Sequence, residues 1–417
     1  MSKEVDVLVI GGGVAGVCVS HYLLESRRQV TLLERNTICS GCSYGNSGLI
    51  VPSHSFPLAV PGVVWKGLKW MLNPESPFFV RLRFDRELFA WLWKFRAACT
   101  HEQMVRAVAA LARLSQASIE LYDELIGREQ LDCGYDRRGS FLLFRTAEGL
   151  NAGLEEARLL HAHGITHRSM TGPQLHEMEP IIRPDLSGGL FFERDAFMNP
   201  SQFVNALAAR LRKKGGAIEE QTEVCRIEHH AGRITRVRTT RGDYHPQQVV
   251  LAAGSWSPGL AGDLPFKLPV QPAKGYSVTF DNRGMKLNYP MIMAEAKAGV
   301  NPMGSMIRMA GTLEMTGIDL SINMRRVKAV VRSVDNYLDG FDENLALQNL
   351  WCGMRPCTPD GLPVIGIPES VSNLIVATGH AMLGMTLGPG TGKLVADLAC
   401  NRKPLLDPIP YSPARFG

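Results

Sequence analysis

The feature that most constrains the fold of this chain is a glycine-rich turn between an apolar strand and a helix near its N-terminus. Residues 5–10 form a short β-branched run that predicts a buried parallel strand. Residues 14–26 have helical character, and residues 29–33 predict a second strand. The turn carries a G-x-G-x-x-G spacing on Gly11, Gly13 and Gly16. Such a unit predicts a Rossmann-like α/β domain that binds a dinucleotide.

Each glycine of the turn has a separate task in this chemistry. Gly11 permits a tight turn, Gly13 lets backbone N–H groups approach a pyrophosphate, and Gly16 lets the helix pack closely on the strand. The helix opens with Val14 and Ala15, where free N–H groups and the helix dipole favour an anion. The turn is therefore predicted to hold the pyrophosphate of the dinucleotide.

An acidic residue follows the second strand. Glu34 lies 18 residues beyond Gly16, close to the spacing of about 20 at which an acid accepts a hydrogen bond from a ribose 2′-hydroxyl. Residues 35–50 are rich in small hydroxyl, amide and glycine residues, which can cradle phosphate and a planar ring with backbone donors. The fingerprint alone does not separate FAD from NAD, but its N-terminal position and this long loop favour FAD.

The charge balance and the cysteine pattern argue against several further classes of protein. The 45 basic and 40 acidic residues leave a net charge of +5 without a basic tail, which argues against a nucleic-acid partner. The 417 residues include nine widely spaced cysteines, an odd number that argues against a disulfide framework and for a reducing compartment. No basic segment with a cleavage site precedes the first strand, so no signal peptide is predicted and a cytoplasmic location is expected.

Cys39 and Cys42 form a C-x-x-C pair inside the loop that follows Glu34. A zinc site needs a second ligand pair at suitable spacing, and none follows. A redox dithiol is an alternative, because such pairs can have a lowered thiol pKa. Ordinary loop packing is the favoured interpretation, and no metal site is predicted.

Residues 53–100 differ in composition from the rest of the chain. Four of the six tryptophans, Trp65, Trp70, Trp91 and Trp93, fall here among seven Lys and Arg residues. Tryptophan and cationic side chains together are typical of a membrane–water interface. The alternative, favoured for most of the rings, is a short helical subdomain whose aromatic side chains form a core.

The rest of the chain alternates between helical and strand-like patterns. Expected helices are 103–130, 150–163, 201–213 with Ser201 as its cap, and 325–338. Expected strands are 140–144, 218–227, 234–239, 248–257 and 374–380, with alternating patterns over 275–315. A glycine-rich loop at 381–392 leads to a final helix at 393–400, whose N-terminus is a second place for anionic charge.

Several segments together resemble the D-amino-acid oxidase superfamily of FAD-dependent oxidoreductases. They are residues 9–16 with 34–35, 251–256, Gly353 to Gly361 around Arg355, and 379–386. Residues 46–48, 274–277, 311–314 and the stretch beginning at 61 are most similar to the D-amino-acid dehydrogenases of the small-subunit type. The resemblance covers nearly the whole chain, from Val5 to about Leu398.

The resemblance implies an α/β flavoenzyme with two domains. A discontinuous Rossmann-like FAD-binding domain is expected from residues 1–55, 196–262 and 350–417. A substrate domain with a mixed or antiparallel sheet is expected from 56–195 and 263–349, with a Trp/Lys-rich helical insertion at about 56–100. FAD is expected to bind noncovalently, because Cys352 and Cys357 are out of register with the cysteine that carries a covalent flavin in some relatives.

The resemblance also implies site residues. Arg355 is expected to bind the substrate carboxylate, since a planar guanidinium is the best bidentate partner for that group. Tyr276 is the candidate for a second contact, Tyr44 an alternative, and His380 is expected beside the flavin. An alternative for Arg355 is a structural pair with Asp360. The residues expected to contact FAD are Gly11, Gly13, Val14, Ala15, Gly16, Glu34, Arg35, Ser43, Asn46, Ser47, Gly48, Leu49, Val224, Ala253, Gly254, Trp256, Gly353, Gly379, Gly384, Met385 and Thr386.

The activity implied is oxidative deamination of a D-amino acid to a 2-oxo acid and ammonia. Hydride passes from Cα to flavin N5, and the electrons go on to a quinone or another respiratory acceptor rather than O2. The alternatives are a dehydrogenase of a cyclic or secondary amino acid (proline, hydroxyproline or sarcosine), alone or as a subunit of a larger flavoprotein complex, an oxidase of the glycine or sarcosine type, and an electron-transfer subunit without its own substrate site. Peripheral contact with the inner membrane is expected through residues 61–96.

Overall fold

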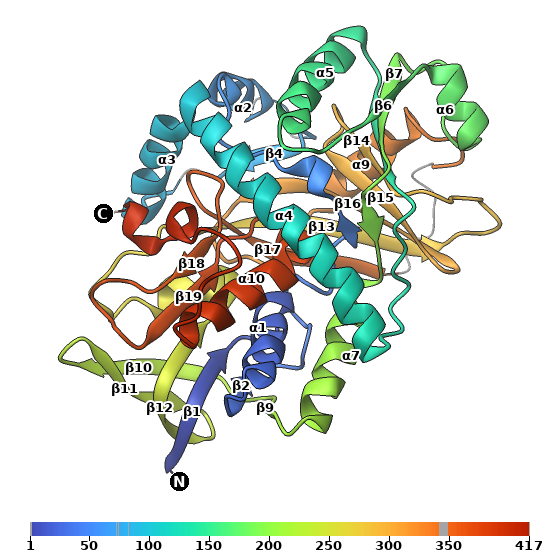
Figure 1. Cartoon of the computed structure of the whole chain (residues 1–417). Helices are drawn as coiled ribbons and strands as arrows, with labels where there is room; N and C mark the ends of the chain where they lie inside the picture. Colours follow the sequence, from blue (N-terminus) through green and yellow to red (C-terminus); the bar gives the residue numbers. More distant parts are fainter. Residues whose placement is uncertain (1, 72, 74, 82, 342–348, 417) are drawn as a thin grey trace.

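The computed structural model describes residues 2–71, 73, 75–81, 83–341 and 349–416. Its strands form two large sheets, one at the lower left and one at the upper right of Figure 1. A short two-stranded ribbon pairs β3 (Leu49–Ile50) with β8 (Ala196–Phe197). This architecture confirms the expected α/β class with a Rossmann-like sheet and a second, mixed sheet.

The first sheet has a parallel centre in the order β9-β2-β1-β12-β19. Its strands are β1 (Ser2–Ile10), β2 (Val30–Leu33), β9 (Ala217–Glu219), β10 (Val224–His230), β11 (Arg233–Thr239), β12 (Gly242–Leu251), β18 (Val364–Gly366) and β19 (Leu374–Thr378). The inner half of β1, Val7 to Ile10, is buried, as expected for a parallel strand covered on both faces. Because β1, β2 and β12 run in the same direction, their carboxyl ends meet at one edge of the sheet.

The second sheet is mostly antiparallel, in the order β17-β13-β16-β15-β14-β5-β7-β6, with β4 parallel to β16. Its strands are β4 (Phe78–Val80), β5 (Ser140–Phe144), β6 (Arg168–Met170), β7 (Gly188–Phe192), β13 (Gln271–Asp281), β14 (Met291–Met293), β15 (Ala298–Met303), β16 (Met306–Met315) and β17 (Asn349–Cys357). β17 pairs with β13 along its length. Strand β17 therefore belongs to the second sheet, although the expected division placed residues 350–417 with the first.

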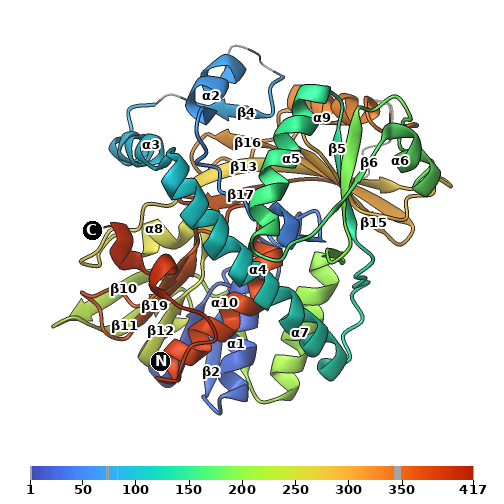
Figure 2. The same ribbon diagram turned by 45° about the horizontal axis from the view of Figure 1, so that its top comes forward.

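The helices cover both sheets (Figures 1 and 2). They are α1 (Val14–Glu25), α2 (Val63–Met71), α3 (Arg86–Ala98), α4 (His101–Glu129), α5 (Ala147–His161), α6 (Gly172–Met178), α7 (Pro200–Lys213), α8 (Ser257–Leu260), α9 (Met324–Asp335) and α10 (Gly384–Ala399), with single 3₁₀ turns η1 (Pro52–His54), η2 (Gly254–Trp256), η3 (Ile409–Tyr411) and η4 (Pro413–Phe416). The apolar face of α4, from Ala107 to Leu125, shares one core with α1 and α10. Helix α4 thus packs on the first sheet's helices, although its segment was assigned to the substrate domain.

The final helix is longer than the sequence suggested. The segment 381–392, expected as a loop, is helical from Gly384 onward despite Pro389. A methyl group on Gly388 would lie 2.8 Å from Val14 Cγ2, and one on Gly392 would lie 2.7 Å from the carbonyl carbon of Cys18. These glycines let α10 approach α1 closely, so their role is helix packing rather than turn formation.

Smaller differences have local causes. The helix at 201–213 begins after Asn199, whose side chain accepts from the backbone N–H groups of Ser201 and Gln202, so Asn199 rather than Ser201 is the cap. The strand expected at 218–227 is two strands, β9 and β10, separated by a turn with Gln221 at φ 54°. The expected hairpin of β10 with β11 and the strand 140–144 are confirmed.

A buried carboxyl group ties the segment that follows β3 to the second sheet. Asp195 accepts hydrogen bonds from Ser53 Oγ at 2.5 Å and from Ser140 Oγ at 2.6 Å. Its side chain is almost fully buried, and burial raises its pKa to about 6. The three side chains form a polar link between β5 and the 3₁₀ turn η1.

The close approach of α10 and α1 predicts opposite effects for two helical Gly→Ala substitutions. Gly392→Ala should lower the free energy of unfolding by about 1–3 kcal/mol, because the methyl group overpacks the contact with Cys18. Gly127 lies on the exposed face of α4, where a methyl group would meet no described atom within 4 Å. Gly127→Ala should therefore raise the free energy of unfolding by about 0.5–1 kcal/mol. Urea unfolding measures both values, and a stabilised Gly392→Ala protein would contradict the packing role.

The link through Asp195 predicts a specific dependence of stability on pH. Between about pH 4 and pH 6 the unfolded chain has lost the Asp195 proton while the folded chain keeps it. The folded state then binds more protons, so this group's contribution to stability decreases as pH rises. The free energy of unfolding of wild type minus that of Asp195→Asn should fall by up to about 3 kcal/mol over this window. A difference that stays constant with pH would show that Asp195 ionises normally.

Candidate functional site

The glycine turn at the end of β1 has the geometry that a pyrophosphate requires. Gly11 has φ +113°, and a methyl group there would lie 2.5 Å from the carbonyl oxygen of Ala252. A methyl group on Gly16 would lie 1.9 Å from the carbonyl oxygen of Gly11. Helix α1 follows Gly13, which has no side chain to cap it, and the first turn of the helix holds no acidic residue. The helix N-terminus therefore offers its positive end and N–H groups to an anion.

Two polar side chains shape the space in front of this turn. Ser43 Oγ accepts a hydrogen bond from the backbone N–H of Val14 at 3.0 Å. Glu34 accepts from the N–H of Gly12 at 2.8 Å and from that of Asn36 at 2.9 Å. The structure thus places Glu34 at the carboxyl end of β2 and against the turn, where a ribose next to the pyrophosphate would lie.

Five more of the residues expected to contact FAD gather at the same edge of the first sheet. The Arg35 guanidinium lies 4.2 Å from the centre of the Trp256 ring, a cation–π contact. Val224 begins β10 and is 8% exposed. Ala253 and Gly254 follow the end of β12, beside Ile10, whose carbonyl accepts from the N–H of Ala252. The structure places these residues near one another, and their contact with FAD stays a prediction.

The loop that carries Asn46, Ser47 and Gly48 is fixed by contacts with β15, α10 and the segment after β8. Asn46 Oδ1 accepts from the N–H of Gly48 at 2.8 Å, and the Gly48 carbonyl accepts from the N–H of Met198 at 2.9 Å. The amide of Asn301 in β15 donates to the Ser47 carbonyl at 2.8 Å. Thr386 Oγ1 of α10 donates to the Leu49 carbonyl at 3.3 Å.

A buried arginine that sequence reasoning did not single out holds this loop. Arg308 of β16 donates to the carbonyls of Tyr44 and Asn46 at 2.8 and 3.0 Å and to Thr279 Oγ1 at 2.9 Å. Its pKa is lowered by burial. In the sequence, the signal that could have identified Arg308 is its position within a strand-like run, next to apolar residues such as Met309.

The N-terminus of α10 faces the same region as the loop. It begins at Gly384, followed by Met385 and Thr386, and no side chain caps it. His380, just before it, is buried, and its Nε2 lies 2.9 Å from Thr391 Oγ1. Burial lowers the pKa of His380 to about 4, so the imidazole is neutral at physiological pH. Gly379 precedes it at φ +80°, where a methyl group would lie 2.6 Å from Thr358 Cγ2.

Arg355 lies on the end of β17, flat against the neighbouring strand. A methyl group on Gly275 of β13 would lie 1.8 Å from Arg355 Nη1, so only glycine leaves room for the guanidinium. Nη1 donates to the carbonyl of Thr312, and Nη2 donates to that of Gly311 at 3.4 Å. Burial lowers the pKa of Arg355, and within the described part of the chain no carboxylate lies within ion-pair distance of it.

The structural alternative for Arg355 is wrong. Asp360 forms its ion pair with Arg415, at 2.7 Å from Nε to Oδ2. Arg415 also donates to the carbonyl of Leu362 at 2.8 Å. The charge of Asp360 is therefore neutralised from the C-terminal segment, and Arg355 is left without a carboxylate partner among the residues described.

The structure does not bring Tyr276 to Arg355. Tyr276 is paired with Cys352 across β13 and β17, while the guanidinium lies over Gly275, and neighbouring residues of a strand point to opposite faces. The Tyr276 ring belongs to the core under α9, and its hydroxyl accepts from the N–H of Asn323 at 3.4 Å. Its predicted part in binding the carboxylate has no support from this arrangement.

Trp351 closes the space beside Gly353. A methyl group on Gly353 would lie 1.8 Å from the Trp351 ring, and one on Gly45 would lie 1.9 Å from it. The indole therefore rests on the two glycines and bridges β17 to the loop that contains Tyr44. The Tyr44 hydroxyl accepts from Asn349 Nδ2 at 3.2 Å, which places this tyrosine near the same end of β17.

The cysteines near the site are free thiols. Cys42 Sγ donates to the Met354 carbonyl at 2.6 Å. Burial raises the pKa values of Cys39 and Cys42 to about 12, which disfavours the thiolate that redox chemistry requires. This arrangement agrees with ordinary loop packing for the C-x-x-C pair.

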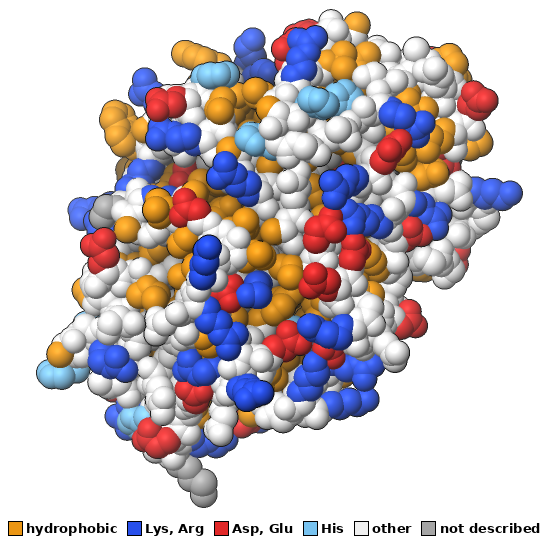
Figure 3. All heavy atoms as spheres, in the orientation of Figure 1, with side chains coloured by type: hydrophobic (Ala, Val, Ile, Leu, Met, Phe, Trp, Pro, Cys, Tyr) orange, Lys and Arg blue, Asp and Glu red, His pale blue; other side chains and the backbone are white. Residues whose placement is uncertain are grey.

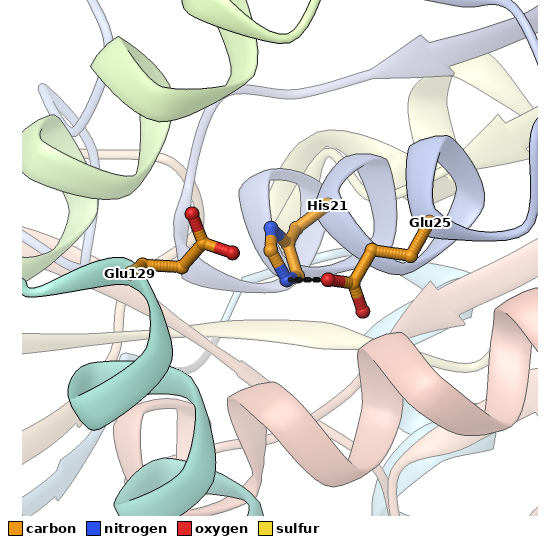
Figure 4. A group of neighbouring side chains, drawn as sticks. All are labelled: His21, Glu25 and Glu129. Carbon is orange, nitrogen blue, oxygen red and sulfur yellow. Dashed lines mark ion pairs between the residues drawn. The ribbon is translucent and has the colours of Figure 1, made fainter.

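One cluster of side chains away from this site has the composition of a metal site. Figure 4 shows His21 and Glu25 of α1 facing Glu129 at the end of α4. Arg128 pairs with Glu25 at 2.6 Å, and Lys214 pairs with Glu129. Since two cationic side chains already neutralise the carboxylates, we assign this cluster to the packing of α1 on α4.

The residues present fit FAD. The N-termini of α1 and α10 both open toward the loop 43–49, and the N-cap residue of neither helix has a capping side chain. The loop contacts the first end through Ser43 with Val14 and the second through Asn46 with the Met382 carbonyl. The site therefore has one anion-binding end for a pyrophosphate and another at the α10 N-terminus, where negative charge on a reduced flavin would be stabilised.

Comparison with known proteins agrees with this geometry. The family of FAD dependent oxidoreductases called DAO matches residues 6–398. The chain is 33% identical to D-amino acid dehydrogenase of Xanthobacter autotrophicus, covering 99% of both chains. It is 34% identical to D-amino acid dehydrogenase of Methylobacterium nodulans, covering 98% of this chain and 99% of that one.

Solved structures show the same fold at lower identity. L-proline dehydrogenase from P. horikoshii superposes with a TM-score of 0.80 at 20% identity, covering 100% of this chain and 98% of that one. Glycine oxidase from Geobacillus kaustophilus superposes with a TM-score of 0.78 at 24% identity, covering 98% of each chain. With the family match spanning nearly all of its length, the chain belongs to the DAO family of FAD-dependent oxidoreductases.

Proposed function

We propose that this protein is an FAD-dependent dehydrogenase of D-amino acids. The observation that carries the proposal is the partly buried Arg355 guanidinium, whose pKa is lowered by burial and which has carbonyl but no carboxylate partners among the described residues. A buried cation without a counter-ion is costly, and a substrate carboxylate would supply the missing charge in a bidentate pair. Full-length relatives named D-amino acid dehydrogenase support the choice of amino acid and of its stereochemistry.

The mechanism follows from positioning. Bound FAD supplies the acceptor for a hydride from the substrate Cα. Arg355 holds the carboxylate, and with the α-amine neutral the remaining requirement is to keep Cα aligned with the acceptor. His380 stays neutral, so it adds no positive charge beside the α10 N-terminus. The imine product then hydrolyses to a 2-oxo acid and ammonia without a protein nucleophile.

We further propose a membrane quinone as the electron acceptor, reached through a surface built by α2 and α3. Trp65 and Trp93 are 74% and 70% exposed. Trp91 is buried and donates a hydrogen bond to the Cys357 carbonyl. The expectation that most of these tryptophan rings form a core therefore does not hold for Trp65 and Trp93. The exposed apolar side chains of this surface are Trp65, Leu68, Phe84, Phe89 and Trp93, joined by Ile318, Leu320 and Ile322.

The position of these apolar residues and the basic side chains among them favour contact with an anionic lipid surface. Gly317 lies against the Arg83 side chain, which connects the segment around Ile318 to the start of α3. Exposed basic side chains accompany the apolar ones on α2 and α3, and Figure 3 shows both kinds mixed at its upper left. None of the described helices is long and apolar enough to cross a bilayer, so the proposed contact is peripheral.

Anaerobic reduction of the flavin tests the activity. D-alanine and other primary D-amino acids should bleach the flavin absorbance, and their L-enantiomers should not. Arg355→Met should keep FAD but raise KM by about 30-fold or more, because a buried charge-assisted pair is worth about 2–5 kcal/mol. Arg355→Lys keeps the positive charge but lacks the paired N–H donors of the guanidinium, so its KM should lie between those of wild type and Arg355→Met.

The same assay separates the alternatives. Bleaching only by proline, hydroxyproline or sarcosine would replace the proposal with a dehydrogenase of secondary amino acids. Rapid reoxidation in air would indicate an oxidase. A yellow protein that no substrate bleaches would indicate a subunit of a larger complex.

Flotation with vesicles tests the membrane surface. Wild type should float with vesicles of anionic lipid at low salt, and the double variant Trp65→Ser/Trp93→Ser should lose most of this binding while keeping its flavin reduction by D-alanine. Leu405→Ser is the matched control, since Leu405 is also exposed but follows α10 beside Asp397. Absence of wild-type flotation at low salt would refute the surface.

A further inference from the structure

Strand β16 is irregular where it passes Arg355. Lys274 of β13 pairs with Glu314 of β16, but Tyr276 pairs with Gly311, so β16 contains one extra residue at this point. The bulge includes Thr312, whose φ is +63°. A β-branched residue is strained in this left-handed region, and such strain tends to gather at functional sites.

The bulge directs two successive carbonyls toward one side chain. In a regular strand neighbouring carbonyls point in opposite directions, so they cannot both reach the same group. Here the carbonyls of Gly311 and Thr312 accept from Nη2 and Nη1 of Arg355. A guanidinium has five N–H donors, and the two contacts fix its plane while leaving other donors for a ligand.

Among the described residues the hydroxyl of Thr312 has no hydrogen-bond partner. Its side chain is 6% exposed, and Oγ1 is buried without a hydrogen bond. Because the carbonyl of the same residue accepts from Nη1, the hydroxyl lies within one residue's length of the guanidinium. A buried hydroxyl without a partner is unfavourable, and it calls for a ligand or another explanation.

We propose that the Thr312 hydroxyl donates a hydrogen bond to the substrate carboxylate held by Arg355. This inference rests on the proposed function, and it assigns the second carboxylate contact that Tyr276 does not supply. The carboxylate would then supply the negative charge that the guanidinium lacks and an acceptor for the hydroxyl. Thr312 thus has two roles, one through its carbonyl, which orients Arg355, and one through its hydroxyl, which binds the ligand.

Thr312→Val separates these roles, because valine keeps the β-branch and the carbonyl but lacks the hydroxyl. KM for D-alanine and the Kd of benzoate, a carboxylate without an amine followed by the flavin spectrum, should each rise about 10-fold or more. FAD content should be unchanged, and the melting temperature of the ligand-free holoenzyme should be equal or higher, because an unpaired buried hydroxyl has been removed. Thr312→Ser should restore most of the affinity.

Thr316→Val is the matched control. Thr316 lies four residues farther along, and its Oγ1 is also buried without a partner. This variant should leave both constants unchanged. If Thr312→Val fails to retain FAD, Thr312→Ala removes the same hydroxyl with less volume and takes its place.

The outcomes distinguish this inference from the proposed function. A wild-type flavin that no amino acid reduces contradicts the proposed function. A wild type that D-alanine reduces, together with a Thr312→Val protein of unchanged KM and Kd, overturns only the role of Thr312. A lower melting temperature with unchanged affinity for benzoate would likewise overturn it, because the hydroxyl would then be a structural contact.

Discussion

Burying a positive charge without an opposing negative one is unfavourable, and the surroundings of Arg355 are arranged around that constraint. The guanidinium lies over Gly275 and donates hydrogen bonds to two backbone carbonyls of β16. Among the described residues no carboxylate lies within ion-pair distance of it. Two neutral acceptors orient the group without cancelling its charge. In the proposed function the substrate carboxylate supplies the negative charge that these neutral acceptors do not.

The two anion-binding ends of the cofactor site depend on the packing of helices. The N-terminus of α10 reaches the loop 43–49 because Gly388 and Gly392 let the helix lie directly against α1. Both helices then run from the same edge of the first sheet, and neither begins with a capping side chain at its N-cap residue. Close packing, rather than any single polar contact, brings the two positive helix ends to one cofactor.

The first sheet and the cofactor turn were predictable from sequence because their signals are local. The run 5–10, the glycines of the turn and Glu34 lie within one βαβ unit, and their spacing follows from the geometry of that unit. The helical character of 384–392 was not predictable, because glycine and Pro389 favour a loop unless a partner helix stabilises the segment. That partner, α1, is more than 350 residues away in sequence.

The substrate side was harder to predict for the same reason. Arg355 was identified through a resemblance, but its carbonyl partners, its glycine cradle and the bulge at Thr312 come from β16 and β13, whose register is not visible in a single sequence. Tyr276 was assigned by residue type and proximity along the chain. Strand alternation places it on the opposite face from the guanidinium, which no count of residues between motifs would reveal.

The chemistry of the site also limits what Arg355 can select. A carboxylate is common to all amino acids, so an arginine that binds it separates acids from amines and alcohols but does not distinguish one side chain from another. Discrimination among substrates must come from surfaces that contact the rest of the molecule. Trp351, seated on Gly353 and Gly45, is four residues before Arg355 in β17 and so lies on the same face of the strand. In the proposed site, Arg355 binds the carboxylate that all substrates share, and Trp351 is a candidate to contact the side chain that differs among them.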